Sequence, residues 1–402
     1  MRSFALRPLL AALPLACVLA CGGSSSTPTA PSDAGTDVAA DAPEVVPTAT
    51  VTASGSLKEA RANHTATLLQ DGRVLVVGGE DISTRTPTAS VEIWDPNSGQ
   101  FTTLAPLPSA VVGHSATLLQ DGRVLIAGSG KFTPNGSPSG EDVSDAAYVF
   151  DPKTNLFKAT GSMAHKRSHH AAFLRSDGKV LVAGGADAVP SDLAPALDSS
   201  ELWDPATDQF SAGPKLAVAR EMGAAVGIGS GRFMVVGGIS PTKGILGSTE
   251  IYDEKANAFI AGPNMVDGGR MYHSVLGTTG GRVFVFGGIQ NGTGSLPVFL
   301  DSVETWSGGE FTLGALAAKG RNSAPLVEAS GHVVAVAGYS YDGLGHFYDD
   351  VLWLGSDGWK TIGKLQFGTF GHTVTKLADG RILVIGGSNA KTQKRTEMIT
   401  IP

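Results

Sequence analysis

The stretch HTATLLQDGRVLVVGG, residues 64–79, decides the fold because the chain repeats it. HSATLLQDGRVLIAGS follows at 114–129, and HTVTKLADGRILVIGG at 372–387. In each copy an alternating segment and a continuous apolar segment flank an Asp-Gly turn, which is the pattern of a tight β-hairpin. The glycines at the end suit a place where another backbone segment approaches too closely for a side chain. The sequence therefore predicts one β-hairpin that has been copied along the chain.

Seven copies of this hairpin follow one another at intervals of 49 to 56 residues. After each hairpin comes a third segment with an acidic residue two positions before a bulky one, as in Glu92 and Trp94. A fourth segment opens with an aromatic residue and closes with Leu or Met, and in the fifth copy this pattern pairs Phe311 with Leu316. A period near 50 residues is typical of one four-stranded propeller blade.

The chain resembles kelch-repeat proteins over residues 51–401, on motifs such as RANHTATLLQDGRVLVVGG and SVEIWDPNSGQFTTLAPL. The resemblance implies an all-β, seven-bladed kelch-type β-propeller with four-stranded antiparallel blades. The seventh copy stops after its third segment, and VTASGSL at 51–57 aligns with a fourth segment, FKATGSM at 157–163. We expect the N-terminal strand to complete the last blade, because this closure buries two sheet edges.

The N-terminus has the features of a signal peptide over residues 1–20. Arg2 and Arg7 precede an apolar stretch of about twelve residues, which at 1.5 Å per residue is too short to cross about 30 Å of hydrocarbon. Its end resembles the lipobox of bacterial lipoproteins, which predicts lipidation at Cys21. Residues 21–50 are then the lipidated Cys and a disordered linker rich in Ser, Thr, Ala, Pro and Asp. The propeller occupies residues 51–402.

These features predict an exported protein that is lipid-anchored to the bacterial cell envelope. Gly22 after the Cys is not the Asp-type signal for inner-membrane retention, which favours the outer membrane. The formal net charge is −7, and there is no basic stripe, so we expect no nucleic-acid partner. Membrane contact is expected through the lipid anchor only, and the protein is expected to be a monomer.

The two cysteines, Cys17 and Cys21, both lie in the N-terminal segment, so the predicted propeller has no disulfide or thiolate site. The sequence has no Gly-rich phosphate loop, nucleophile elbow or clustered metal-ligand motif, so we expect no cofactor, no metal and no catalytic residues. One histidine stands at the same register position in each of five copies: His64, His114, His170, His273 and His372. Their spread around the ring favours a structural hydrogen bond in each blade over a metal site.

Arginines stand three residues before several of these histidines, on the connectors between blades. They are Arg61, Arg167 and Arg270, with Arg220 at the equivalent place in the fourth copy. In one interpretation each arginine pairs with the acid of a third strand and so compensates a buried charge. In the other, several converge near the axis and bind an anionic group through bidentate contacts. The two interpretations are not exclusive.

The loops between the second and third strands are long and differ from one another. They span 129–146, 186–200, 289–302 and 339–350, and they open on the same face as the connectors. A rigid ring with variable loops on one face favours ligand binding there. Aromatic and polar groups in these segments suit a sugar or a peptide. The predicted ligand-binding residues are Arg61, Arg167, Arg220, Arg270, Tyr272, Tyr339, Tyr341 and His346.

Two functions fit these features. The first is a non-catalytic binding protein that presents its loop face to a glycan, a peptide or a protein. The alternative is a sugar-modifying enzyme similar to the kelch-type sialic acid mutarotases, although those resemble six-bladed rings. Copper radical oxidases similar to galactose oxidase need a Cys cross-linked to a Tyr. The one cysteine of the expected mature chain, Cys21, is assigned to the lipid, which argues against this class of enzyme.

Overall fold

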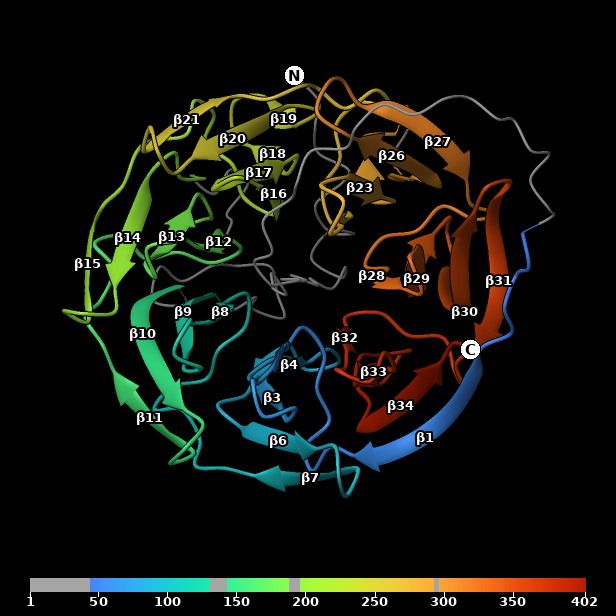
Figure 1. The fold of residues 1–402 in the computed structure, drawn as a ribbon, viewed down its shortest axis with the longest axis horizontal. Helices are drawn as coiled ribbons and strands as arrows, with labels where there is room; N and C mark the ends of the chain where they lie inside the picture. Colours follow the sequence, from blue (N-terminus) through green and yellow to red (C-terminus); the bar gives the residue numbers. More distant parts are fainter. Residues whose placement is uncertain (1–43, 131–142, 188–195, 293–295) are drawn as a thin grey trace, which may run out of the picture.

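The computed structural model describes residues 44–130, 143–187, 196–292 and 296–402. These residues form seven four-stranded antiparallel sheets arranged around a central axis (Figure 1). The first strand of every blade contacts the first strands of both neighbouring blades, and contact between β2 and β32 closes the ring. The predicted seven-bladed propeller is therefore confirmed. The predicted signal peptide, Cys21 and most of the predicted linker lie outside the described residues.

Each of the first six blades is built from four strands that follow one another in the chain. Blade 1 contains β2 (Thr65–Leu68), β3 (Val74–Val77), β6 (Val91–Asp95) and β7 (Gln100–Thr103), and blade 2 contains β8 (Ser115–Leu118), β9 (Val124–Gly130), β10 (Val143–Asp151) and β11 (Leu156–Ala159). Blade 3 contains β12 (Ala171–Leu174), β13 (Val180–Ala183), β14 (Ser200–Asp204) and β15 (Gln209–Ala212), and blade 4 contains β16 (Ala224–Gly229), β17 (Arg232–Val236), β20 (Thr249–Asp253) and β21 (Ala258–Ala261).

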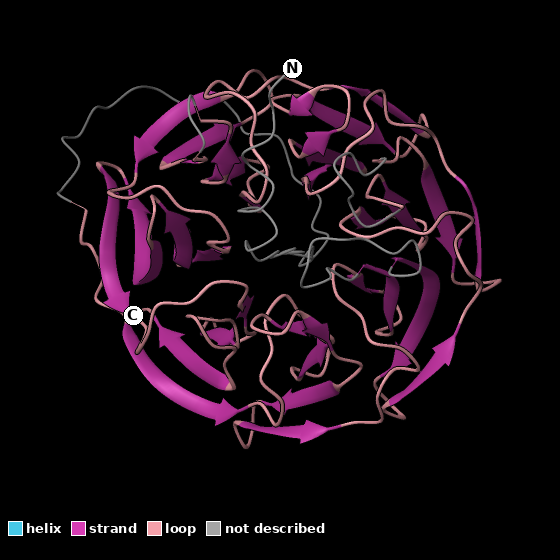
Figure 2. Cartoon of the chain, turned by 180° about the vertical axis from the view of Figure 1, so that it is seen from behind, coloured by secondary structure: helices cyan, strands magenta, loops and turns pink. Residues whose placement is uncertain are grey.

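Blade 5 contains β22 (Ser274–Gly277), β23 (Val283–Phe286), β26 (Ser302–Trp306) and β27 (Thr312–Leu316), and blade 6 contains β28 (Leu326–Ala329), β29 (His332–Tyr341), β30 (Gly345–Gly355) and β31 (Gly358–Lys364). Three small hairpins lie in the loops between second and third strands: β4–β5 (Glu80–Asp81, Thr86–Pro87), β18–β19 (Ile239–Ser240, Gly244–Ile245) and β24–β25 (Ile289–Gln290, Val298–Phe299). Figure 2 shows the described part of the chain as strands and loops.

Blade 7 joins the two ends of the chain. Its strands are β32 (Thr373–Lys376), β33 (Ile382–Ile385), β34 (Arg395–Thr400) and, on the outside, β1 (Thr50–Ser56). Val51 pairs with Ile399, as Phe101 pairs with Trp94 in blade 1. The closure predicted from VTASGSL is confirmed, together with the predicted register.

The glycine pairs end the second strands where the backbone of a connector passes. A Cβ added to Gly79 would lie 2.6 Å from the carbonyl oxygen of Ala62, and the φ of Gly79 is +94°. Any side chain there would collide with the connector. Ala62 of the connector and Glu80 form an antiparallel β-bridge in which each N–H donates to the carbonyl of the other residue. The repeated Gly-Gly is thus required by contact between adjacent backbone segments.

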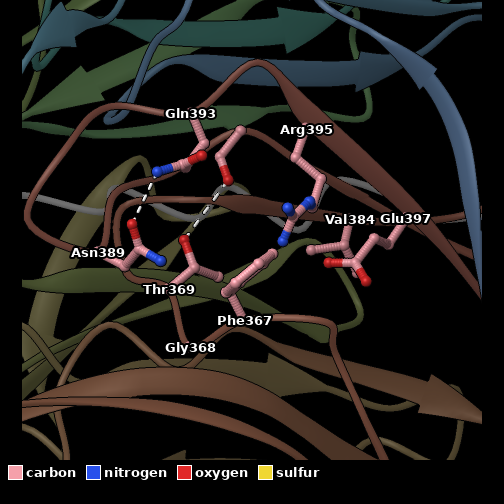
Figure 3. A pocket seen from close by; sticks show the side chains of 9 residues that line it. Phe367, Gly368, Thr369, Val384, Asn389, Gln393, Arg395 and Glu397 are labelled. Atoms are coloured by element: carbon pink, nitrogen blue, oxygen red, sulfur yellow. Dashed lines mark hydrogen bonds between the residues drawn. The ribbon is translucent and has the colours of Figure 1, made fainter.

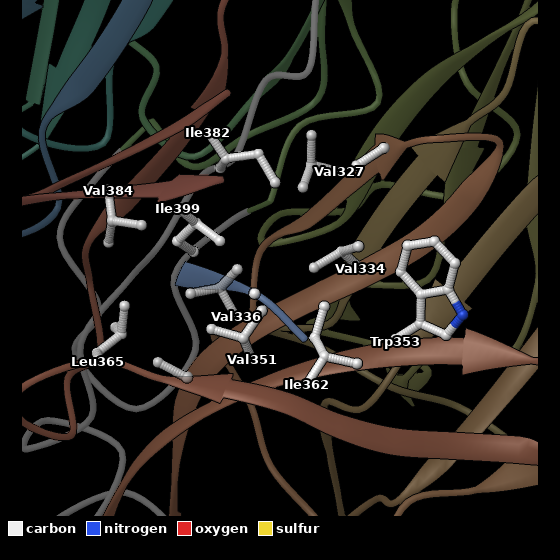
Figure 4. Close-up of a cluster of buried hydrophobic side chains, with 13 residues drawn as sticks. Val327, Val334, Val336, Val351, Trp353, Ile362, Leu365, Ile382, Val384 and Ile399 are labelled. Atoms are coloured by element: carbon white, nitrogen blue, oxygen red, sulfur yellow. The ribbon is translucent and has the colours of Figure 1, made fainter. Parts of the chain in front are cut away.

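Apolar side chains fill the space between neighbouring blades, so that each cluster belongs to two sheets. Figure 4 shows the cluster between blades 6 and 7, where Val336, Val351 and Trp353 face Ile382 and Ile399. Second strands are apolar on both faces because each faces a neighbouring blade on either side. In β33, for example, all four residues are buried.

One position of the predicted pattern is wrong by a single residue. Leu316 was expected to close the fourth strand of blade 5, but it is 59% exposed, while Ala317 is buried. The Ala317 N–H donates to the carbonyl of Asp301, as the Leu107 N–H donates to the carbonyl of Ala89 in blade 1. A register irregularity between Ser302 and Glu304 shifts the pairing of β26 with β27, which accounts for the offset.

No helix of a length and hydrophobicity sufficient to cross a membrane occurs in the described ranges.

Candidate functional site

The connector arginines are buried and hydrogen-bonded within their blades. The Arg61 guanidinium lies 2.8 Å from Glu92 on β6 and also donates to the carbonyls of Gly78 (2.9 Å) and Ser90 (2.8 Å). Both side chains of this ion pair are fully buried. Burial lowers the pKa of Arg61, and the charge of Glu92 opposes that shift. The pair therefore compensates two charges that would be costly if unpaired.

The same arrangement recurs in blades 3 to 6. The ion pairs are Arg167–Glu201 (2.7 Å), Arg220–Glu250 (2.9 Å), Arg270–Glu304 and Arg321–Asp350. The acid also holds the chain that enters its blade: Glu250 accepts backbone N–H groups from Ala217 (2.7 Å) and Val218 (3.1 Å).

Pairing with a third-strand acid is therefore the arrangement seen in the structure for the four arginines predicted to bind a ligand. Their ligand-binding role stays a prediction. A ligand could contact Arg61, Arg167, Arg220 or Arg270 only by entering a buried site in which a carboxylate already occupies the guanidinium. Such a displacement would leave the acid buried without its partner.

The repeated histidines link neighbouring blades. His114 Nε2 lies 2.9 Å from Thr65 Oγ1 of the preceding blade, and His64 and His170 make the same contact with Thr373 and Ser115. The blades before His273 and His372 carry Ala224 and Pro325 at this position, which have no hydroxyl group. Burial lowers the pKa of His114 to about 3 and that of His372 to about 4, so both are neutral at pH 7. A hydrogen bond from the histidine to a hydroxyl group of the preceding blade is thus present at three of the five positions.

The connectors come together at the axis through a ring of residues whose backbone has the left-handed conformation. The residue just before the histidine position has a positive φ in every blade: Asn63, Gly113, His169, Met222, Tyr272, Ser323 and Gly371. Backbone N–H groups of this ring donate across blade boundaries, from Asn63 to Gly371 (2.7 Å) and from His169 to Gly113 (2.8 Å). The same bond joins Met222 to His169 and Ser323 to Tyr272, each at 3.2 Å.

Buried polar side chains gather at this ring and form what we call the axial polar cluster: Asn63, Glu80, Arg85, Glu221 and Tyr272. Asn63 and Arg85 donate to the same Glu80 oxygen at 2.8 and 2.9 Å. Burial raises the pKa of Glu80, and the charge of Arg85 opposes that shift. Burial also raises the pKa of Tyr272, with a further contribution from the charge of Glu221. Carboxylates, a guanidinium and a phenol therefore share one environment.

Next to the axial polar cluster lies a group of rings that we call the aromatic cluster: Phe299, Tyr339, Phe347 and Phe370. Tyr339 has ring-centroid distances of 6.0 Å to Phe299 and 5.2 Å to Phe347 and Phe370. Tyr339 and Phe347 are only partly buried. Tyr272 belongs to a buried apolar group with Met271 and Ile289, against which Phe299 and Tyr339 pack. Tyr272 thus joins the two clusters.

The predicted loop residues fall into two places. Tyr272 and Tyr339 meet at the junction of the two clusters. Tyr341 and His346 lie at the tip of the β29–β30 hairpin, where Tyr341 pairs with Gly345 and the partly buried His346 contacts Asp342 at 2.9 Å. Parts of the predicted loops, residues 131–142, 188–195 and 293–295, lie outside the described residues.

Sequence reasoning missed most of the axial polar cluster. Glu80 directly follows a glycine pair and Glu221 directly follows Arg220, so their register positions could have marked both as axial. Within the described residues, there is no group of three or more His, Cys, Asp or Glu side chains placed to hold a metal ion.

Comparisons with known proteins agree with this geometry. Residues 60–108 match the Kelch motif. The chain is 30% identical to alpha-scruin over 202 residues and 28% identical to beta-scruin over 200 residues, both from Limulus polyphemus. Each match covers 50% of this chain and 21% of the scruin, so the chain spans about a fifth of the length of these curated relatives.

Two solved structures share the fold. The structure of YjhT has a TM-score of 0.58 and 13% identity, covering 76% of this chain and 98% of the other. A fungal alcohol oxidase of the AA5 family in complex with copper has a TM-score of 0.64 and 14% identity, covering 88% of this chain and 76% of the other. At these identities the likeness concerns the fold alone. With the motif in blade 1 and its pattern in all seven blades, the chain is a kelch-repeat β-propeller.

Proposed function

We propose that this protein is a non-catalytic binding protein of the bacterial cell envelope, anchored through a lipid on Cys21, that holds a glycan on its loop face. The observation that carries the proposal is the partly exposed aromatic cluster beside the axial polar cluster. Sugar rings present apolar faces and many hydroxyl groups, so aromatic rings next to polar groups suit them.

Tyr339 is the central residue of this proposal. It contacts three other rings of the aromatic cluster and packs toward Tyr272. Burial raises the pKa of Tyr339, so its hydroxyl stays protonated near neutral pH and is able to donate a hydrogen bond. Tyr341 and His346, farther out on the same hairpin, would supply further polar contacts to a longer glycan. A peptide ligand would use the same surface and is an outcome of the test.

A glycan and peptide array tests this function. We would use the chain from residue 22 onward, which contains every described residue and avoids lipidation. We expect glycan binding that Tyr339→Ala weakens at least about tenfold, because a stacked aromatic contact and its buried area are lost. Leu156→Ala, an exposed substitution on the outer strand β11, serves as the matched control and should bind normally. No binding to any glycan would contradict the proposal.

The sugar-modifying alternative is favoured by one observation, which is the presence of Glu80 and Glu221 with Arg85 and Tyr272 in a single buried cluster. Acid, base and anion-binding groups are the parts that a mutarotase needs. Anomer exchange of reducing sugars, followed by NMR with and without the protein, separates the two functions. Acceleration that is lost in Glu221→Gln would replace the binding function by an enzymatic one.

A further inference from the structure

Blade 7 lacks the connector arginine but keeps the acid. Thr369 stands where the other five blades described above place an arginine, and Glu397 stands at the position of Glu250. In blade 4 the Arg220 guanidinium donates to Glu250 and to the carbonyls of Gly237 (3.0 Å) and Ser248 (3.0 Å). Among the described residues, the equivalent carbonyl in blade 7, that of Gly386, accepts one side-chain hydrogen bond, a 3.5 Å contact from the Thr369 hydroxyl. The shorter side chain therefore leaves the guanidinium position open.

A small pocket that opens to solvent lies at this position (Figure 3). It is formed by the connector into blade 7, the loop between β33 and β34, and the inner part of β34. Its side chains are Phe367, Thr369, Val384, Asn389, Gln393, Arg395 and Glu397. Phe367 is 48% exposed, so the pocket has an aromatic wall that reaches solvent.

The acid in this pocket has fewer donors than its counterparts. In the part of the chain that the structure describes, the side-chain carboxylate of Glu397 accepts one hydrogen bond, from the backbone N–H of Gln366 (2.8 Å). Glu250 accepts two backbone N–H groups and the guanidinium of Arg220. Burial raises the pKa of Glu397, and the charge of Arg395 opposes that shift. The carboxylate is therefore buried, 6% exposed, and able to accept a further donor.

Arg395 does not occupy the open position. It stands two residues before Glu397 on β34, where blade 4 has Ser248, and its guanidinium lies 4.0 Å from the centre of the Phe367 ring. It therefore lines the wall of the pocket and is stacked on the aromatic ring, as Figure 3 shows. Its positive charge would weaken the binding of a second cation without filling the site.

We propose that the pocket of blade 7 binds a guanidinium group supplied from outside the chain. The acceptors there are the Glu397 carboxylate and the Gly386 carbonyl, which are equivalent to the groups that hold an arginine in each of the five blades with a connector arginine. A planar guanidinium matches a carboxylate through two parallel hydrogen bonds, which an ammonium group cannot form. The source is either a small guanidinium compound or an arginine side chain of a polypeptide.

Methylguanidinium is the probe, and saturation-transfer NMR on the chain from residue 22 onward is the measurement. We expect millimolar binding of methylguanidinium and at least about threefold weaker binding of methylammonium. Thr369→Arg, which places a guanidinium in the pocket from within the chain, should remove the signal. Glu397→Gln should also remove it, and thermal unfolding of both variants would show that they are folded.

Arg395→Gln sharpens the test. Removal of the neighbouring positive charge should strengthen methylguanidinium binding by about threefold or more, since two charges several ångströms apart repel even at high dielectric. Equal signals from the wild-type chain and Thr369→Arg, or no signal from either the wild-type chain or Arg395→Gln, would overturn the proposal.

A pair of short peptides distinguishes the two sources. An acetylated Gly-Arg-Gly amide that binds more tightly than methylguanidinium, and more tightly than its Lys counterpart, would identify an arginine side chain as the ligand. Tighter binding of methylguanidinium than of the Arg peptide would identify a small guanidinium compound. Because no residue of the axial polar cluster or the aromatic cluster lines this pocket, Tyr339→Ala should leave this binding unchanged.

Discussion

Blades 2 and 7 both lack the connector arginine, yet they differ in what became of its partner. Blade 2 has Val111 at the arginine position and Tyr148 at the acid position, and both side chains are buried in one apolar cluster. Blade 7 has Thr369 with Glu397, and a pocket remains between them. Replacing both members of a buried ion pair by apolar groups leaves a packed interior, whereas removing only one leaves a buried charge with an open position.

This difference teaches that the match between the two positions matters more for stability than the ion pair itself. Burying two charges costs hydration free energy, and the attraction between them compensates only part of that cost. A protein with a well-packed apolar pair in their place is therefore often as stable. A buried acid without its partner keeps the full desolvation cost. The repeat therefore tolerates an apolar pair in blade 2, and it tolerates the open acid of blade 7 where a ligand or solvent reaches it.

The largest effect is expected from removing the strand that blade 7 takes from the other end of the chain. A chain that begins at residue 58 lacks β1 and Leu57, so β34 becomes an exposed edge and the ring loses its closure. We expect loss of cooperative unfolding, measured by differential scanning calorimetry. The control is a chain that begins at residue 44, and an unchanged transition in the shorter chain would show that closure is unimportant.

Acidification should lower stability by the next largest amount. The pKa values of His114 in blade 2 and His372 in blade 7 lie at about 3 and about 4, below the value of about 6.5 of an unfolded chain. The folded protein holds both histidines in the neutral form. Their contribution to the free energy of unfolding is therefore fully present above pH 6.5 and is lost as the pH falls toward 4 and 3. Between the unfolded and folded pKa values, each such histidine should lower the free energy of unfolding by about 1.4 kcal/mol per pH unit.

His64, His170 and His273 have pKa values lowered for the same reason, whereas burial raises those of Glu80 and Glu397, which shifts stability in the opposite direction. The pKa of His169 is lowered in the same way, so six histidines outweigh the two acids. Urea unfolding at pH 7 and pH 5.5 should therefore show a loss of several kcal/mol in the free energy of unfolding. In an NMR titration of the folded chain His114 and His372 should both stay neutral at pH 5.5, and protonation of either near pH 6.5 would contradict the effect of burial.

Breaking one arginine pair should have a smaller effect that tests the comparison directly. Arg220→Met leaves Glu250 buried without its guanidinium, and we expect a loss of about 3–5 kcal/mol in the free energy of unfolding. The double variant Arg220→Val with Glu250→Tyr, which copies blade 2, should lose clearly less. Chemical denaturation measures both, and an equal or larger loss in the double variant would refute the role of matched partners.

The smallest effect is expected from completing blade 7. Thr369→Arg combined with Arg395→Ser gives this blade the residues that blade 4 has at the two positions. We expect a gain of about 1–2 kcal/mol, since charge-assisted hydrogen bonds to a buried acid replace an open position. Thermal unfolding measures the gain. Arg395→Ser alone is the control, and stability equal to that of the control would mean that the new arginine does not reach Glu397.

The fold could be predicted in detail because the repeat records it seven times. The hairpin pattern, the period and the truncated last copy were enough to predict seven blades and an N-terminal strand that completes the last one, where Val51 pairs with Ile399. The exception is Leu316, because an irregularity in strand pairing moved Ala317 into its place without a signal in the sequence. The pattern shared by the copies predicts the usual strand register. It cannot predict an irregularity that is present in one copy alone.

The site was predicted only in part. Tyr272 and Tyr339 were selected from the sequence, and the structure places them together. Glu80, Arg85 and Glu221 were missed because each occurs in a single copy, where the repeat offers no comparison. The connector arginines were correctly given a pairing partner as one interpretation, but whether they face the partner or a ligand depends on side-chain packing.

The sequence by itself determined the number of blades, their strand order and the closure of the ring, because these follow from hydrophobic periodicity and turn residues that are local in the chain. Only the tertiary structure decided which single-copy residues meet at the axis and that blade 7 contains a pocket beside a buried acid. Those features depend on contacts between connectors, loops and strands far apart in sequence, and their geometry is set by the packing of adjacent blades.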